Sequence, residues 1–276
     1  MKAAQAGMNE ATMDAEIEAD GPGPTPRTEA GSRSVSLAET AYDRIEELIV
    51  HFTLRPGADL KTQTVQEMIG LGRTPTHQAI RRFAAETLII IRPRDGLQIS
   101  PIDLMRDRRL LRLRRDMDRF VVELAAERLS GNHRNQLLHL AQRLRDRRDA
   151  MDAVEFNGYD RALDQTILAA AGEPFLDRTL RPLHIVFRRI GWLYLSEIDR
   201  EVGLKETIDR HIDLLEAVID RNAARAKAAS DLLIDFADSM FGPLETTIAP
   251  ELLDASVVPL YTATPRRQPG RQAPVP

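Results

Sequence analysis

The sequence contains no cysteine, and its apolar residues never gather into a long uninterrupted run. Without cysteine the chain has no disulfide framework and no thiolate site for a metal or for redox chemistry. No apolar stretch approaches the ~20 residues that cross a bilayer, and the N-terminal residues lack the apolar core of a secretory signal. We therefore expect a protein of the reducing cytoplasm that has no membrane partner.

What the chain does contain is ordinary for a globular protein, with 43% hydrophobic and 29% charged residues, and 276 residues leave room for two domains. Residues 1–36 mix small, polar and proline residues without a period, which predicts a disordered tail. Residues 243–276 are rich in proline and predict a second flexible tail. Between them we expect two domains, at 37–102 and 103–242.

Residues 59–100 spell a helix, a tight turn, a second helix and a hairpin. Gly70 and Gly72 supply the backbone freedom for a steep turn between the two helices. The second helix is predicted to begin sharply, with Thr74 as its cap and Pro75 at its first position. An amphipathic helix that ends before residue 56 precedes these elements and supports them.

Two β-branched runs, 88–91 and 97–99, flank an Asp-Gly pair, which is a strong hairpin signal. Helix, turn, helix and hairpin together outline a winged helix-turn-helix, which places one helix in the major groove of DNA. The exposed side of that helix offers hydrogen-bonding side chains suited to phosphates and base edges, at Arg73, Thr74, Thr76, His77, Gln78 and Arg81. The hairpin, or wing, adds Arg92, Arg94 and Gly96.

Positive charge is scarce for such a domain, because residues 37–101 hold eight Lys and Arg against eight Asp and Glu. The acids concentrate in the first helix and the arginines in 73–94, so a basic face can still form locally. We expect few phosphate contacts and a weak dependence of DNA binding on salt.

The motifs Pro56-Gly57, Arg73-Thr74-Pro75, Ala79-Ile80-Arg81-Arg82 and Arg92-Pro93-Arg94-Asp95-Gly96 resemble the DNA-binding domain of GntR-family bacterial transcription regulators. The resemblance implies that DNA contacts include the position of Gln63. Three residues depart from the usual pattern, since Gln63 and His77 stand where the family has arginine and Gln78 stands where it has glutamate. The departures concern operator choice and affinity more than the fold.

Beyond residue 101 the pattern changes to long helices joined by short loops, which must bury their apolar stripes against one another. We expect a mainly α protein whose C-terminal domain is a six-helix antiparallel bundle. The predicted helices are Asp103–Ser130, His133–Met151, Ala153–Ala171, Pro174–Asp199, Lys205–Asp220 and Ala223–Phe241. The arginine-rich stretch 105–119 is interpreted as a solvated helix face.

This bundle resembles the FCD effector domain of the fatty-acid-regulator-like branch of the GntR family. The resemblance is carried by Arg114 with Leu124-Ala125-Ala126, by Asp160 with Ile167 and Ala170-Ala171-Gly172, and by Asp209-Arg210-His211 with Leu215-Glu216-Ala217. It implies a domain that responds to a small carboxylate effector, often held with the help of a divalent metal.

Carried over by position, the metal ligands fall on Asp160, Asp164 and His211, while the fourth falls on Leu233, which cannot ligate. One imidazole and two carboxylates suit zinc, manganese or nickel. The alternative is that the pocket has lost its metal and that the two aspartates lie on a wet face. Arg114 is the candidate partner of an effector carboxylate, and its alternative is a salt bridge to Asp118.

The sequence thus predicts a transcription regulator, not an enzyme, that binds a palindromic double-stranded DNA operator as a homodimer under the control of a small acid. A constitutive dimeric DNA-binding protein without an effector is the alternative within the same class. A metal-dependent hydrolase is the alternative from another class, but no nucleophile–base arrangement or phosphate loop supports it.

Overall fold

The computed structural model describes residues 36–92 and 96–257. Nearly all of the expected N-terminal tail, the last residues from 258 onward and the wing residue Arg94 lie outside the described residues. Within the described part, no helix is long and apolar enough to cross a membrane.

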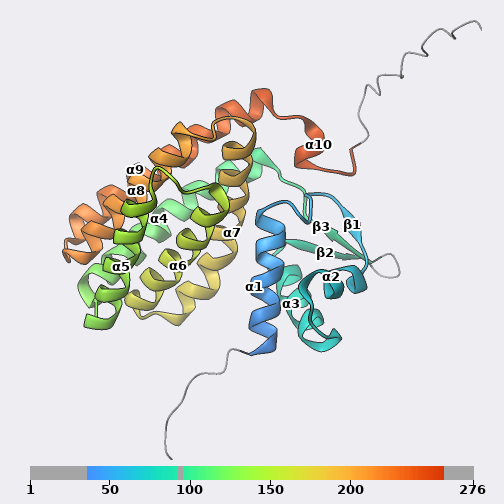
Figure 1. Ribbon diagram of the computed structural model, residues 1–276, viewed down its shortest axis with the longest axis horizontal. Helices are drawn as coiled ribbons and strands as arrows, with labels where there is room; N and C mark the ends of the chain where they lie inside the picture. Colours follow the sequence, from blue (N-terminus) through green and yellow to red (C-terminus); the bar gives the residue numbers. More distant parts are fainter. Residues whose placement is uncertain (1–35, 93–95, 258–276) are drawn as a thin grey trace, which may run out of the picture. The chain divides into compact units, whose positions relative to one another are not determined.

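The first domain is the expected winged helix-turn-helix (Figure 1). Its elements are α1 (Leu37–Val50), β1 (Asp59–Leu60), α2 (Thr62–Ile69), α3 (Arg73–Ala85), β2 (Ile89–Arg92) and β3 (Gly96–Ile99). The strands form an antiparallel sheet in the order β1-β3-β2, with Ile89 opposite Ile99 and Asp59 opposite Gln98. The hairpin was predicted, but β1 was not, because a strand of two residues is too short to show an alternating pattern.

The turn between α2 and α3 depends on Gly70, which ends α2 in the left-handed conformation with φ 63°. Helix α3 begins at Arg73, so Thr74 lies inside the helix and is not its cap, and no side chain in the described part of the chain caps it. Pro75 falls in the first turn, where a backbone N–H has no partner within the helix and its absence is tolerated.

The core of the winged-helix domain extends into the next domain through α1. Tyr42 of α1 stacks on Phe83 of α3 with 4.2 Å between ring centroids, and its hydroxyl donates to Glu86 over 2.6 Å. Ile185 and Val186 belong to the same buried cluster, although they lie far along the chain on α7 (Pro174–Glu197). Helix α1 therefore stands between the reading helix α3 and the helical domain.

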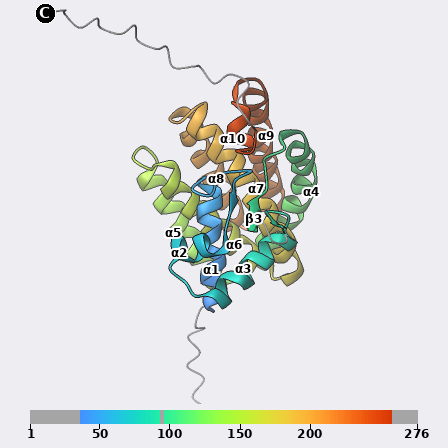
Figure 2. The ribbon, with the colours of Figure 1, turned by 90° about the vertical axis from the view of Figure 1, so that its right-hand side faces the viewer.

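The second domain is a bundle of six helices, as expected, and the mainly α fold class is confirmed. They are α4 (Leu104–Arg128), α5 (Gly131–Arg147), α6 (Ala153–Ala171), α7, α8 (Val202–Ile219) and α9 (Ala223–Thr247). Helix α4 lies along α9 and α6, and α8 packs against α9 and α5 (Figures 1 and 2). Aspartate caps fix two of the starts, with Asp103 accepting from the amide of Arg106 and Asp152 from that of Glu155.

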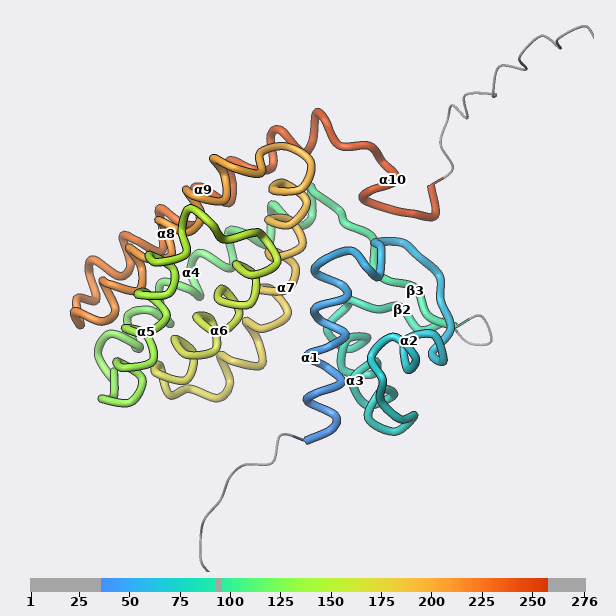
Figure 3. Tube along the Cα trace, in the orientation of Figure 1, coloured from blue at the N-terminus to red at the C-terminus, as the bar shows by residue number. Residues whose placement is uncertain are grey.

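The chain does not leave the bundle at residue 242. Helix α9 continues through Pro243 to Thr247, and a short helix, α10 (Pro250–Leu253), follows it (Figure 3). The amide of Ile102 donates to the carbonyl of Leu253 over 2.8 Å, and that of Ala255 donates to the carbonyl of Pro56 over 2.8 Å. The expected flexible tail is therefore wrong for residues 243–257, because packing against the first domain outweighs the local effect of proline.

Candidate functional site

Helix α3 presents most of the expected DNA-contacting side chains on one exposed surface. Arg73, Thr74, Gln78 and Arg81 are exposed, and His77 is half-buried. The opposite side of α3 is held against α1 by its apolar residues. These five side chains can all donate hydrogen bonds, so the surface is suited to phosphate and base-edge contacts.

Thr76 does not belong to this surface. It is fully buried, and its hydroxyl donates to the carbonyl of Gly72 over 2.8 Å. Its spacing of four residues from Ile80 and seven from Phe83 places it on the buried side of the helix. Thr76 therefore supports the turn, and its expected place on the exposed face of the helix is wrong.

The remaining DNA candidates lie on α2 and on the wing. Gln63 is exposed on α2 and donates to Glu67 over 2.9 Å. Arg92 is exposed and donates to Gln98 over 2.7 Å, which holds its guanidinium along the sheet. Gly96 has φ 106°, and a Cβ there would meet the carbonyl oxygen of Leu60 at 2.6 Å, so glycine is required by close backbone approach. Contacts of Gln63, Arg92 and Gly96 with DNA remain predictions.

A second candidate site is a cluster of buried charges inside the bundle. Asp160 and Asp164 lie one turn apart on α6 and both face Arg188 of α7. The Arg188 Nε donates to Asp160 over 3.0 Å, and a terminal nitrogen donates to Asp164 over 2.9 Å. Only 6% of the Arg188 side chain is exposed, so its charge must be balanced inside the protein.

Two histidines extend this cluster on either side. His211 of α8 lies between Asp160, 3.0 Å from its Nε2, and the backbone carbonyl of Thr207, 2.7 Å from its Nδ1. His184 of α7 lies 3.0 Å from Asp164 through Nδ1. Farther out, Arg114 of α4 donates to Asp118 over 3.0 Å, and Asp118 lies 3.6 Å from Nε2 of His184. The salt bridge that was the alternative role of Arg114 is therefore present, and an effector role for Arg114 remains a prediction.

The neighbours of each group decide its protonation. Burial and Asp164 would raise the pKa of Asp160, but the hydrogen bond from His211 and the charge of Arg188 outweigh them and lower it. The pKa of Asp164 is likewise lowered against burial, mainly by His184 and Arg188. Burial would lower the pKa of His184, yet its carboxylate neighbours raise it to about 9. Near neutral pH the cluster thus holds ionised carboxylates and a protonated His184.

The residues of this cluster do not fit the metal that the resemblance implies. Asp160, Asp164 and His211 do lie together, but the Arg188 guanidinium lies against both carboxylates, and both ring nitrogens of His211 already have acceptors. Leu233 supplies no ligand. Among the described residues, no group of three or more His, Asp or Glu side chains is arranged to hold a metal ion. The two aspartates do not lie on a solvent-exposed face either, because they are largely buried and the charge of Arg188 neutralises them.

Arg188 also reaches out of the bundle to the winged-helix domain. Its third nitrogen donates to Glu46 of α1, a residue that is 2% exposed. Arg161 of α6 lies 3.5 Å from the same carboxylate, and Arg181 of α7 donates to Glu39 of α1 over 2.6 Å. The acids that concentrate in α1 therefore face arginines of the bundle.

Two cavities meet at Arg188. The inner cavity, between the bundle helices, measures about 70 Å³ and is lined by Asp160, Asp164, Arg188 and His211 among others. The interdomain cleft measures about 480 Å³ and is lined by Glu46 and His51 of α1, by Asn157 and Arg161 of α6 and by Arg188 of α7, with further α1 and α6 residues. The inner cavity has room for about two waters, whereas the interdomain cleft has the size of a small-molecule site.

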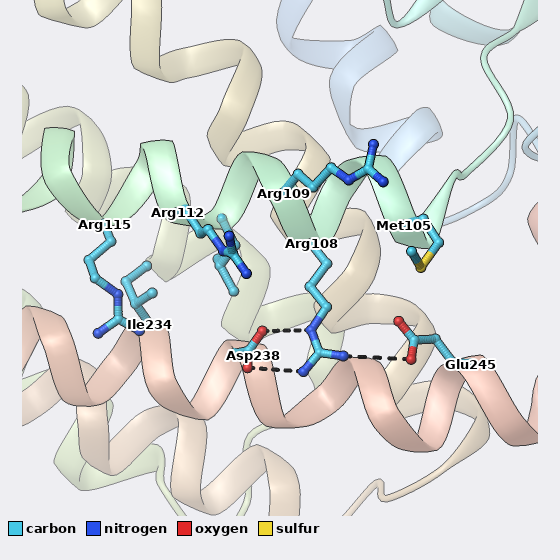
Figure 4. A pocket seen from close by; sticks show the side chains of 9 residues that line it. Met105, Arg108, Arg109, Arg112, Arg115, Ile234, Asp238 and Glu245 are labelled. Carbon is cyan, nitrogen blue, oxygen red and sulfur yellow. Dashed lines mark hydrogen bonds and ion pairs between the residues drawn. The ribbon is translucent and has the colours of Figure 1, made fainter.

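A third cavity, the α4–α9 cavity, measures about 530 Å³ and lies along the arginine-rich stretch of α4 (Figure 4). Arg108 donates to Asp238 of α9 over 2.9 Å and pairs with Glu245 at 3.6 Å. Arg112 lines the same cavity, and Arg109 points away from α9 in Figure 4. The stretch that we interpreted as a solvated face is thus in part a set of ion pairs that join α4 to α9.

Sequence reasoning missed the residues that connect the two domains. Glu39 and Glu46 are seven residues apart on α1, and Arg181 and Arg188 are seven apart on α7, with His184 between them. Such spacing places each set on one side of its helix. Two helix sides that are charged with opposite signs were therefore visible in the sequence, but nothing there showed that they meet.

Known families match both domains. Residues 37–99 match the family described as bacterial regulatory proteins, gntR family, and residues 109–236 match the FCD domain. The chain belongs to the GntR family. It is a transcription regulator with an FCD domain, as the resemblance of its motifs predicted.

Two relatives of this GntR regulator are named as transcription regulators. The HTH-type transcriptional regulator McbR of Escherichia coli K12 is 23% identical over 67% of this chain and 84% of its own length. The HTH-type transcriptional repressor RspR of the same organism is 22% identical over 68% of this chain and 81% of its own length. The solved structure of E. coli McbR/YncC superposes with a TM-score of 0.67 at 20% identity, over 77% of this chain and 100% of that one, which shows the shared fold.

Proposed function

We propose that this GntR regulator binds a two-fold symmetric operator as a homodimer in the cytoplasm, and that a small carboxylic acid held by its FCD domain changes its affinity for DNA. The observation that carries the proposal is the exposed set of donors on α3, with Arg73 and Arg81 at the two ends. One reading helix contacts few bases, so two copies about one turn of DNA apart are needed for specificity.

An apolar stripe on α4 supports the dimer. Met105, Leu113 and Phe120 are exposed by 60%, 51% and 51%, and their spacing of eight and seven residues places them on one side of the helix. Large apolar side chains in a row are typical of an interface. If this face joins two copies, light scattering gives a dimer for the parent and a monomer for Leu113→Glu.

The effector part of the proposal rests on the buried charges at the base of the interdomain cleft. Arginine is the residue that best recognises a carboxylate, because its fork of N–H donors matches the two oxygens. Arg188 supplies such a fork beside a cleft of small-molecule size. A hydrolytic metal centre at Asp160, Asp164 and His211 receives no support, since the same guanidinium lies against both carboxylates.

The test is the affinity for DNA from upstream of the protein's own gene, measured by fluorescence anisotropy at two salt concentrations. We expect Arg73→Ala and Arg81→Ala to weaken binding by roughly 1–3 kcal/mol each where the side chain reads a base. The matched control is Arg143→Ala, an exposed arginine on α5, which should bind like the parent. Recognition by α3 is refuted if both reading-helix variants also bind like the parent.

A constitutive regulator is the second candidate function. A screen of small acids distinguishes it from the first candidate. For a constitutive regulator, no acid in the screen would change either the melting temperature of the protein or its affinity for DNA. The helical domain would then serve only to join two copies.

A further inference from the structure

Among the described residues, Glu46 is the one carboxylate on Arg188 that the bundle does not supply. Asp160 and Asp164 come from α6, next to α7 in the bundle, whereas Glu46 comes from α1 of the winged-helix domain. Each of the three carboxylates takes a different nitrogen of the guanidinium. Removal of Glu46 would therefore free one terminal nitrogen of Arg188, Nη1, and leave its contacts with the bundle in place.

Only one of the two carboxylate oxygens of Glu46 accepts a hydrogen bond from the described residues. Its Oε1 accepts from Arg188 and lies 3.5 Å from Nε of Arg161. Its Oε2 is buried and has no hydrogen-bond partner among the described residues. A buried acceptor without a partner is costly, so a carboxylate that satisfied both of its oxygens at this place would be bound more favourably.

Donors that have no hydrogen-bond partner among the described residues line the same cleft as Glu46 and Arg188. Within the described part of the chain, Nε of Arg161 and Nδ2 of Asn157 are also buried without a hydrogen-bond partner. Both residues line the interdomain cleft, as Glu46 and Arg188 do. With Glu46 displaced, three donors for an anion lie around one cleft. They are Nη1 of Arg188, Nε of Arg161 and Nδ2 of Asn157. The cleft volume of about 480 Å³ suits a small organic molecule.

We propose that Glu46 is a built-in competitor for the effector, which is a small carboxylate that enters the interdomain cleft and takes the place of the Glu46 carboxylate on Arg188. The charge of the cluster is unchanged by the exchange, because one carboxylate replaces another. The displaced Glu46 no longer ties α1 to the bundle, so the winged-helix domain is released from one of its buried contacts. This inference rests on the proposed function, in which the regulator responds to a small acid.

Acetate is a suitable probe, since it is a small molecule that carries the same carboxylate group as the side chain of Glu46. The full chain and its Glu46→Ala variant are melted in sodium acetate and in sodium chloride of equal ionic strength. We expect Glu46→Ala to melt below the parent and to recover with a saturating dependence on acetate. Because Glu46 no longer competes in this variant, the apparent Kd of the variant for acetate should be at least about ten-fold lower than that of the parent.

Controls separate this site from other charges. Acetamide has the shape of acetate without its charge and should not restore Glu46→Ala. Glu39→Ala removes another α1 acid that pairs with a bundle arginine, Arg181, but does not line the interdomain cleft, and the apparent Kd of this variant for acetate should stay near that of the parent. Arg112→Ala in the α4–α9 cavity should leave the response of the parent unchanged. Glu46→Gln, which keeps the side-chain shape, replaces Glu46→Ala if the latter does not fold.

The inference is overturned if acetate stabilises the parent and both Glu46 variants equally, or if it stabilises none of them. Operator affinity is measured separately on Glu46→Gln, with and without acetate. If acetate binds this variant but operator affinity is the same in the parent, in the variant and in the variant with acetate, the site stands and the effector part of the proposed function fails.

Discussion

Arg188 and Arg189 are neighbours on α7 and both are buried, yet their surroundings are opposite. Burial would lower the pKa of Arg188, but Glu46, Asp164 and Asp160 raise it above its ordinary value. Arg189 donates to the carbonyl of Ser100 over 2.7 Å and has no hydrogen-bond partner at Nε among the described residues, and burial lowers its pKa to about 10. A buried charge is stable only where opposite charges and hydrogen bonds replace water.

The difference divides the contact between the domains into two regions. Around Arg188, Glu46 joins α1 to the bundle, while Asp160 and Asp164 bind the same guanidinium within the bundle. Around Arg189, the linker that joins β3 to α4 is held through Ser100, and Asp107 lies nearby with no hydrogen-bond partner for its Oδ1 within the described residues. Burial raises the pKa of Asp107 to about 6, against the charges of Arg106 and Arg189. The second region is therefore the weaker one.

The largest expected effect is that of Arg188→Met. The substitution leaves three carboxylates buried without the cation that joins them, so we expect a loss of about 3–5 kcal/mol in the free energy of unfolding, measured in urea. A loss below about 1 kcal/mol would mean that the three carboxylates gain little from Arg188.

A pH dependence should set the second region apart. The raised pKa of Asp107 means that the folded state holds this proton more tightly than the unfolded state. Its contribution to stability is present at low pH and is lost as pH rises from about 4 to about 6. Between pH 4 and 7 the parent should lose on the order of 3 kcal/mol relative to Asp107→Asn. Parallel pH profiles of the two proteins would show that Asp107 titrates normally.

Arg189→Met should cost much less than Arg188→Met. It removes one hydrogen bond to Ser100 and one of the two arginine charges near Asp107, but it also ends the burial of an incompletely paired guanidinium. We expect a loss of about 1 kcal/mol in the same urea experiment. Equal losses for the two methionine variants would erase the distinction between the two regions.

The smallest expected effect is that of a chelator. Because Arg188 supplies the positive charge between Asp160 and Asp164, the melting temperature of the parent should stay the same, to within measurement error, after treatment with EDTA or after addition of zinc or manganese. A clear rise in melting temperature with added metal would show that the guanidinium gives way to an ion.

The sequence predicted what depends on local pattern. The reading helix, the wing hairpin and the six bundle helices were recognised because caps, glycines and helical periodicity lie within a few residues of one another. Thr76 was misplaced because a polar residue can lie in a buried stripe when its hydroxyl finds a carbonyl. The end of α9 was misplaced because packing outweighed the proline at 243.

What could not be predicted depends on contacts between distant parts of the chain. Arg188 and Glu46 are separated by 142 residues, and no local pattern shows that they meet. The resemblance to the FCD domain pointed to Asp160, Asp164 and His211, and these residues do lie together. It gave no sign that an arginine on the next helix would take the place of a metal.

The central claim is that Arg188 joins the FCD bundle to α1 through Glu46. A double-mutant cycle of Glu46→Gln and Arg188→Met, with unfolding free energies measured in urea at one protein concentration, tests it most directly. We expect a coupling free energy of at least about 1.5 kcal/mol between the two positions, as found for residues in direct buried contact. Losses that add to within about 0.5 kcal/mol would show that the two residues act independently and would contradict the account.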